Sequence, residues 1–147
     1  IMLSLTYTIK LNSQSQFRAL ATQKAQETVD LFRRERTVLG WNDFADVLTD
    51  GQTYCVREIP DQTSQSTSDH LFDDDTDGIY WEPTGTGCAY DVETAEVPVD
   101  FKREAYVEFD NTNPDLPLII VEVTVSWDNE NSSDDFSVQL EKEFRPW

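Results

Sequence analysis

The chain has 147 residues, of which 11 are Lys or Arg and 29 are Asp or Glu, so its formal net charge is −18. This length suits a single domain with a hydrophobic core. Four Trp, five Tyr and eight Phe residues argue against a chain that is disordered throughout. Such an acidic surface repels the phosphates of nucleic acids, so we expect no direct nucleic-acid binding.

The charge is divided unevenly along the chain. Residues 1–40 hold six basic and three acidic residues, whereas residues 41–147 hold five basic and 26 acidic ones. We expect the first part to be a helix and the second an acidic, β-rich head, and their opposite charges suggest contacts between the head of one copy and the helix of another. Only four of the 11 basic residues are Lys, so adaptation to high salt explains the acidity equally well.

Apolar residues recur at helical spacing in residues 17–32 and predict an amphipathic helix. The segment is rich in Ala, Gln, Glu, Leu and Arg, which are good helix formers. The last turns of the predicted helix carry Arg33, Arg34 and Arg36, and positive charge is favourable at a helix C-terminus. We expect the helix to end at Gly40, because glycine is common just after a helix. The stripe expected to pack on the head comprises Phe17, Ala21, Ala25, Val29 and Phe32.

Residues 1–11 allow two main interpretations. Their apolar members alternate with smaller or polar residues, as in a β-strand, and are Leu3, Leu5, Tyr7, Ile9 and Leu11. Neither Gly nor Pro separates them from the helix, which favours a continuous helix. Such a helix would be about 55 Å long, against a diameter of about 38 Å for a compact domain of this size, so its apolar end would project. A secretion signal or a complete transmembrane span fits these residues poorly.

Beyond the helix, short runs of strand-forming residues alternate with turn residues. We expect strands at 53–59, 87–92, 102–109, 117–127 and 136–144, and a short helix or a turn at 41–48. The last two strands should pair as an antiparallel hairpin, with Val121, Val123 and Val125 on one face. The predicted fold is α+β, with a long N-terminal α-helix packed against an antiparallel β-sheet.

Cys55 and Cys88 are the two cysteines of the chain. In an exported domain such a pair suggests one disulfide, whereas in a cytosolic chain it more often stays reduced. Closing a loop of about 34 residues would stabilise the fold by roughly 3–4 kcal/mol. Neither cysteine lies in a CxxC motif, so we do not expect zinc.

The order of these features resembles the minor pilin and pseudopilin branch of the type IV pilin superfamily. The likeness rests on ATQKAQETVDLFRRER in the helix, the aromatic turn GWNDF, a central region with two cysteines, and the C-terminal VEVTVSWDNENSSDDFSVQLEKEF. It implies a bacterial subunit of a type IV pilus or type II secretion filament, anchored in the inner membrane before it assembles at the cell surface with other pilin or pseudopilin subunits.

The same resemblance gives a role to the apolar residues at 3–11, which would join the core of the filament. Family members open with a leader peptide and carry an acidic residue at the fifth mature position. This chain has Leu5 there. The resemblance therefore implies a member that lacks most of its membrane half.

The segment FDDDTDGIYWE contains the pattern D-x-D-x-D-G, the first half of a calcium loop in which alternate carboxylates converge. Thr84 stands at the position where an EF-hand loop carries Glu, so a solvated acidic loop is the competing interpretation. The predicted ligands of Ca²⁺ are Asp73, Asp75, Asp77 and Glu82, together with the backbone carbonyl of Ile79.

Catalysis finds little support in the sequence. His70 is the single histidine and lies in a polar segment, and the chain has no phosphate loop, nucleophile elbow or zinc motif. We therefore expect a structural subunit and not an enzyme. The competing hypothesis is an extracellular calcium-dependent adhesion or binding module in which residues 3–11 form an ordinary strand.

Binding of calcium can be measured directly by isothermal titration calorimetry on the purified protein. If the carboxylates converge on Ca²⁺, we expect heat of binding and a higher melting temperature at millimolar Ca²⁺, both of which Asp75→Asn should remove. Absence of heat together with an unchanged melting temperature would contradict the predicted site.

Overall fold

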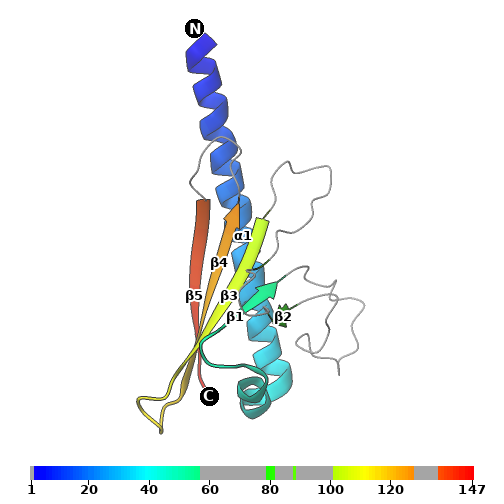
Figure 1. The fold of residues 1–147 in the computed structure, drawn as a ribbon, viewed down its shortest axis with the longest axis vertical. Helices are drawn as coiled ribbons and strands as arrows, with labels where there is room; N and C mark the ends of the chain where they lie inside the picture. The colour runs from blue at the N-terminus through cyan, green and yellow to red at the C-terminus, as the bar shows by residue number, and fades with distance from the viewer. Residues whose placement is uncertain (1, 57–78, 82–87, 89–100, 128–135) are drawn as a thin grey trace.

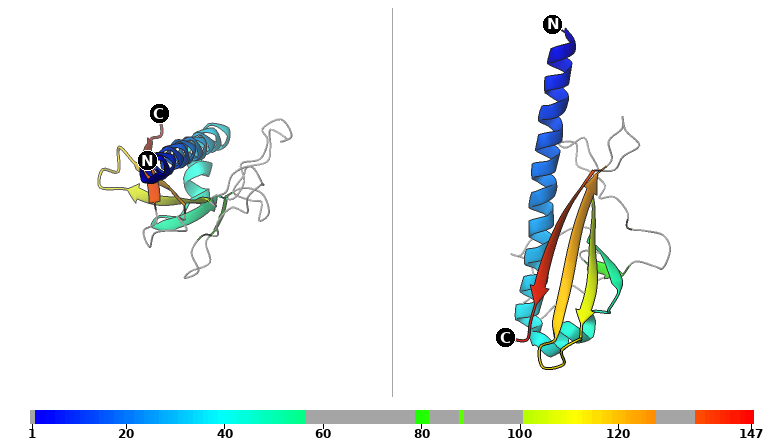
Figure 2. Two further views of the ribbon diagram at one scale, coloured as in Figure 1. Left: turned by 90° about the horizontal axis from the view of Figure 1, so that it is seen from above. Right: turned by 90° about the vertical axis from the view of Figure 1, so that its left-hand side faces the viewer.

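The computed structural model describes residues 2–56, 79–81, 88, 101–127 and 136–147 of the chain. One helix, α1, spans Met2–Val47 and is followed by strands β1 (Gln52–Val56), β2 (Ile79–Trp81), β3 (Phe101–Asp110), β4 (Leu118–Trp127) and β5 (Phe136–Phe144). The strands form one sheet in the order β2-β1-β3-β4-β5, and every pair of neighbours is antiparallel. Helix α1 lies along one face of this sheet (Figure 1, Figure 2). The predicted α+β fold is confirmed.

Residues 2–16 are helical and not a strand, so the continuous helix is confirmed. The chain has no Gly or Pro between Met2 and Leu39, and therefore nothing in this segment interrupts the helical hydrogen bonds. At 1.5 Å per residue the segment is about 57 Å long. Its N-terminal part extends past the ends of the strands, as Figure 1 shows.

Gly40 interrupts α1 with φ 78° and ψ 173°, a backbone conformation that residues with a Cβ rarely adopt. A second helical segment then runs from Trp41 to Val47. The expectation that the helix ends at Gly40 is thus correct for the long straight segment only. Arg33, Arg34 and Arg36 consequently do not lie in the last turn of α1.

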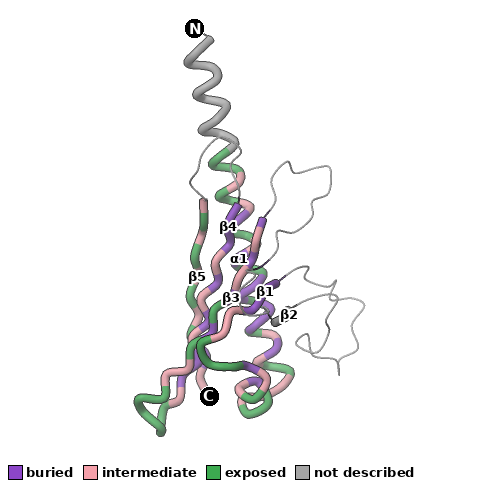
Figure 3. Tube along the Cα trace, in the orientation of Figure 1, coloured by how far each residue is buried: buried purple, intermediate pink, exposed green. Residues whose placement is uncertain are grey.

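The core forms where the apolar stripe of α1 meets the sheet. Ala21, Ala25 and Phe32 are completely buried, Val29 is almost so, and Phe17 lies half-buried at the edge of the core. The sheet contributes one face of β4, on which Val121, Val123 and Val125 are completely buried. Figure 3 shows buried residues gathered between the helix and the middle of the sheet. The small Ala side chains let the helix approach the strands closely.

The predicted C-terminal hairpin is confirmed, because β4 pairs with β5 from Ile119↔Phe144 to Trp127↔Phe136. The strand predicted at 53–59 is observed at Gln52–Val56, and residues 57–59 lie outside the described part of the chain. Of the strand predicted at 87–92, only Cys88 is described, and it is not in a strand. Strand β2 was not predicted, because three residues are too few to show a period.

The turn from α1 into β1 is held by three hydrogen bonds. The Asp50 carboxylate accepts from the backbone N–H of Phe109 at 2.7 Å, and the N–H of Gly51 donates to the carbonyl of Val107 at 2.8 Å. The N–H of Thr49 donates to the hydroxyl oxygen of Tyr54 at 2.9 Å. Gly51 has φ 73°, which favours glycine at this position. These bonds set the start of β1 beside the end of β3.

The contact between helix and sheet can be tested with Phe32→Ala. Because Phe32 is completely buried, its truncation should lower the free energy of unfolding by about 3–5 kcal/mol. The matched control is Gln23→Ala on the exposed side of the same helix, which should change it by less than about 0.5 kcal/mol. Urea unfolding followed by circular dichroism measures both, and equal losses in the two variants would contradict the observed packing.

Candidate functional site

The apolar residues predicted to mediate assembly lie in the part of α1 that extends past the sheet (Figure 1, Figure 2). On a helix, residues four apart share a face. Leu3, Tyr7 and Leu11 therefore occupy one face, and Leu5 and Ile9 occupy a nearly opposite one. A helix with apolar residues on opposite faces is suited to burial by neighbours on more than one side.

Polar residues separate this projecting segment from the core. Gln14, Ser15 and Gln16 are exposed, and the first completely buried residue of the helix is Ala21. The sheet thus covers α1 only from about Phe17 onward. Within the part of the chain that the structure describes, no helix has an apolar stretch of the length needed to span a membrane.

The side of α1 that faces away from the sheet carries a row of polar contacts within the helix. Gln23 donates to Glu27 at 3.0 Å, and Asp30 accepts from Gln26 at 3.3 Å and pairs with Arg33 at 3.2 Å. Each of these exposed pairs contributes a few tenths of a kcal/mol to the stability of the helix.

Two arginines of α1, Arg18 and Arg34, take no part in these contacts. Among the described residues, neither Arg18, which is exposed, nor Arg34, which is half-buried, has a side-chain ion pair or hydrogen bond. The two side chains are 16 residues apart, which places them about 160° apart around the helix.

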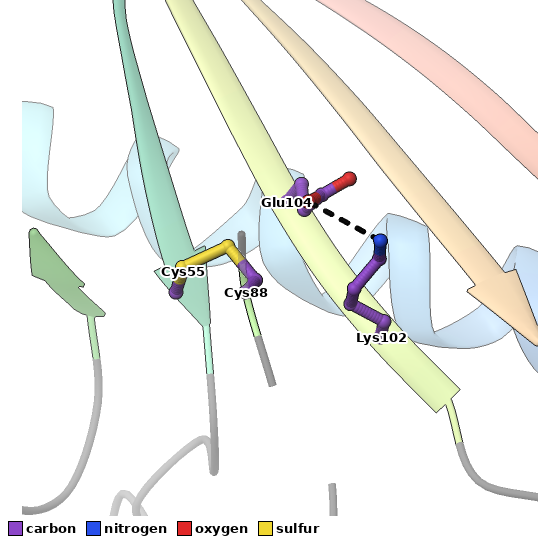
Figure 4. The surroundings of a disulfide bond; sticks show 4 residues. All are labelled: Cys55, Cys88, Lys102 and Glu104. Atoms are coloured by element: carbon purple, nitrogen blue, oxygen red, sulfur yellow. Dashed lines mark ion pairs between the residues drawn. A yellow bond between two sulfur atoms is a disulfide. The ribbon is translucent and has the colours of Figure 1, made fainter. Parts of the chain in front are cut away.

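Cys55 and Cys88 form a disulfide, as predicted, with their Cα atoms 5.4 Å apart. Cys55 lies in β1 between β2 and β3, so the bond ties residue 88 to the interior of the sheet (Figure 4). The two residues are only 2% and 8% exposed. Their burial protects the bond from exchange with other thiols, which is typical of a structural disulfide.

The predicted calcium ligands fall largely outside the described residues, since Asp73, Asp75, Asp77 and Glu82 are not among them. Ile79 is described and lies in β2, opposite Val56 of β1. In the described ranges, no group of three or more His, Cys, Asp or Glu residues is arranged so that it could hold a metal ion. Calcium binding stays a prediction.

A feature that the sequence analysis missed is the acidic sheet face, the side of β3, β4 and β5 that points away from α1. Five glutamates project there, and we define the acidic sheet face by Glu104, Glu108, Glu122, Glu141 and Glu143. Lys102 shares this face and pairs with Glu104 at 3.5 Å, as Figure 4 shows. The alternation of Glu with apolar residues in all three strands was the signal for it.

A second missed feature joins the chain after β5 to the helix. The Arg36 guanidinium donates to the backbone carbonyls of Arg145 at 3.1 Å and Pro146 at 2.8 Å. The same group lies 5.5 Å from the ring centre of Trp41, just beyond the kink. Arg36 therefore connects both segments of α1 to the C-terminal residues, a contact that spacing along the chain does not predict.

Hydrogen bonds lower the pKa of one carboxylate, that of Asp110 at the end of β3. Thr112 donates to Asp110 Oδ1 from its hydroxyl at 2.6 Å and its backbone N–H at 2.9 Å, and these bonds lower the pKa of Asp110 below its usual 3.8. Because the pKa is lowered in the folded state, these hydrogen bonds stabilise the turn at pH values above the usual pKa of an aspartate. That stabilisation is lost as the pH falls through the lowered value.

Comparison of the chain with protein-family models, with curated proteins and with solved structures finds no match.

The contribution of the disulfide can be measured with the double variant Cys55→Ser, Cys88→Ser. Its free energy of unfolding in urea should be lower by about 3–4 kcal/mol, because the unfolded chain regains the freedom that the closed loop removes. A reducing agent should lower the stability of the wild type to the same value and leave the variant unchanged. Equal stability of the oxidised wild type and the variant would show that the bond does not constrain the fold.

Proposed function

We propose that the chain is a structural minor subunit, a minor pilin or pseudopilin, of a type IV pilus or type II secretion-like filament, and that it assembles through its N-terminal helix. The observation that carries this proposal is the projecting segment of α1 with apolar residues on opposite faces. A filament in which the helices of several subunits pack side by side would bury both faces at once.

The energies involved are compatible with assembly through this segment. Each large apolar side chain that becomes fully buried contributes about 1.5–3 kcal/mol, so the five residues together contribute on the order of 10 kcal/mol. Association of two proteins requires about 4–15 kcal/mol to offset the loss of translational and rotational freedom. The two quantities are similar, so contacts between the heads would add to the helix contacts in a stable filament.

The disulfide supports a location outside the cytoplasm, because such bonds persist in oxidising compartments. On this proposal the subunit is anchored in the inner membrane before assembly and is then part of a filament at the bacterial cell surface. Its partners are other pilin or pseudopilin subunits, and its role is structural and not catalytic.

The competing hypothesis of an adhesion module required residues 3–11 to be a strand, and this expectation is wrong because they are helical. The described residues hold no feature that favours the adhesion module over the filament subunit.

Assembly can be tested by placing charges on the projecting helix. Leu5→Glu with Ile9→Glu should raise the concentration needed for self-association at least tenfold, because each buried carboxylate would lose its hydration. The control is Gln14→Glu with Gln16→Glu, which adds the same charge at positions that are already exposed. Sedimentation velocity and electron microscopy measure assembly, and circular dichroism checks the fold.

Two results would contradict the proposed function. One is a wild-type protein that stays monomeric up to millimolar concentration. The other is an assembly that persists equally in the Leu5→Glu, Ile9→Glu variant and in the control.

A further inference from the structure

In the described part of the chain, the two edges of the sheet differ greatly in length. One edge is β2, which has three residues, and the other is β5, which has nine (Figure 1). Strand β5 pairs with β4 without a bulge, and it contains no Pro. Its other side, which we call the open edge, makes no backbone hydrogen bond to any described residue. A long and regular edge of this kind presents unpaired N–H and C=O groups to a further strand.

The apolar side chains along the open edge are incompletely covered as well. Phe136, Val138 and Leu140 face α1 and pack against the core, yet all three are only half-buried. Their cross-strand partners on β4 are buried. A strand placed beside β5 would continue the apolar layer and bury this row of three side chains.

The C-terminal part of β5 discourages pairing with another strand, but its N-terminal part does not. A charged side chain that points toward the core side of an edge strand opposes the addition of a further strand. Lys142 is such a residue, because it shares the side of β5 that faces α1. Residues Phe136–Leu140 contain no charged residue on either side of the strand. The accessible stretch of the open edge therefore ends before Lys142.

The carboxylate of Glu141 indicates which charge an added strand should carry. Glu141 is exposed on the face away from α1 and lies directly opposite Glu122 of β4. Among the described residues, Glu122 accepts a hydrogen bond from Gln139 at 3.4 Å, and neither carboxylate has an ion pair. Like charges directly opposite each other destabilise a sheet, and a cation beside them on the next strand would offset the repulsion. The open edge thus favours a strand with a basic side chain on this face.

The long edge of a second copy does not meet this requirement. We consider an antiparallel pair of two β5 strands with both helices on the same side of the joined sheet. The face away from α1 would then carry Ser137, Gln139, Glu141 and Glu143 of each copy, none of which is basic. A strand of a different chain can supply the missing cation.

We propose that the open edge of β5, over residues 136–141, binds an extended segment of another protein as a sixth strand of the sheet. Apolar residues of this segment cover the half-buried apolar row of β5, and they alternate with residues that include Lys or Arg beside Glu141. Backbone hydrogen bonds supply the affinity, and the alternation of side chains supplies the selectivity. The projecting part of α1 takes no part in this contact, so the inference goes beyond the proposed filament function.

Synthetic peptides test the contact. The probe is a capped peptide of about seven residues in which Val and Lys alternate, a length typical of a strand. One control has the same residues with all Val grouped together, and the other is the probe methylated on the backbone nitrogens of two adjacent central residues. Both controls keep the charge, but the first loses the alternation and the second loses a hydrogen-bond donor on each edge.

Isothermal titration calorimetry measures the affinities of the three peptides. Each control should bind at least tenfold more weakly than the probe, because alternation and backbone donors are both needed for a ladder. Equal affinity of all three peptides would show only attraction between a basic peptide and an acidic protein, and would overturn the proposal.

Hydrogen exchange of the backbone amides locates the bound probe. The amides of β5 that point away from β4 should exchange more slowly in the complex, because they become hydrogen-bonded. The amides of β2, at the opposite edge of the sheet, should not change. Protection that appears elsewhere and not on β5 would contradict the site.

Variants of the protein test the apolar row. Val138→Lys places a charge on the side of the open edge that faces α1 and should weaken binding of the probe at least tenfold. The matched control is Gln23→Lys, which adds the same charge at an exposed position of α1 and should bind like the wild type. Circular dichroism checks that both variants are folded. Equal affinity of the two variants would contradict docking at the open edge.

A charge-removing variant tests the role of Glu141. Glu141→Gln should weaken binding of the probe but leave unchanged the binding of a peptide in which Val alternates with Thr, because only the probe carries a cation. An equal effect on the two peptides would show that Glu141 does not select a basic strand.

The remaining outcomes separate this contact from self-association and from the proposed function. Protection of β5 amides in the protein alone that disappears on dilution would identify a second copy as the occupant and overturn the proposed partner. The Leu5→Glu, Ile9→Glu variant should bind the probe like the wild type, because its substitutions lie in the projecting part of α1. Failure of peptide binding therefore leaves the filament proposal intact, and failure of assembly leaves the open edge intact.

Discussion

The structure depends on the packing of the apolar stripe of α1 against the valine face of β4. Ala21 and Ala25 have no side chain beyond Cβ, so the helix axis can lie close to the strands, and Val29 and Phe32 fill the space further along. This contact sets the direction of the helix relative to the sheet. Because the stripe ends near Phe17 while the helix continues, the same contact determines which part of the helix projects.

The packing also separates the charges of the molecule. One face of the sheet is covered by the helix, so the glutamates that alternate with the buried residues must point to the other side. The basic residues of residues 1–40 lie on α1, beyond the core from these glutamates. Among the described residues, the glutamates of the sheet and the basic residues of α1 therefore lie on opposite sides of the core.

The sequence predicted helices and strands well where a periodic pattern extended over many residues. The stripe from Phe17 to Phe32, the strands at 102–109 and 117–127, and the C-terminal hairpin all carry patterns of eight or more residues that one structure satisfies. The sequence was less informative where the same pattern of residues is compatible with both a helix and a strand. Residues 3–11 alternate like a strand, and only the absence of Gly and Pro favoured the helix that is observed.

The sequence by itself determined the fold class, the long helix and its buried stripe, because each depends on residue type and local spacing. Tertiary structure alone decided that Arg36 binds the carbonyls of Arg145 and Pro146, and that Glu122 faces Glu141. These features join residues far apart in the chain. Strand register and helix orientation bring them together, and a shift of one residue would move every glutamate of a strand to the opposite face.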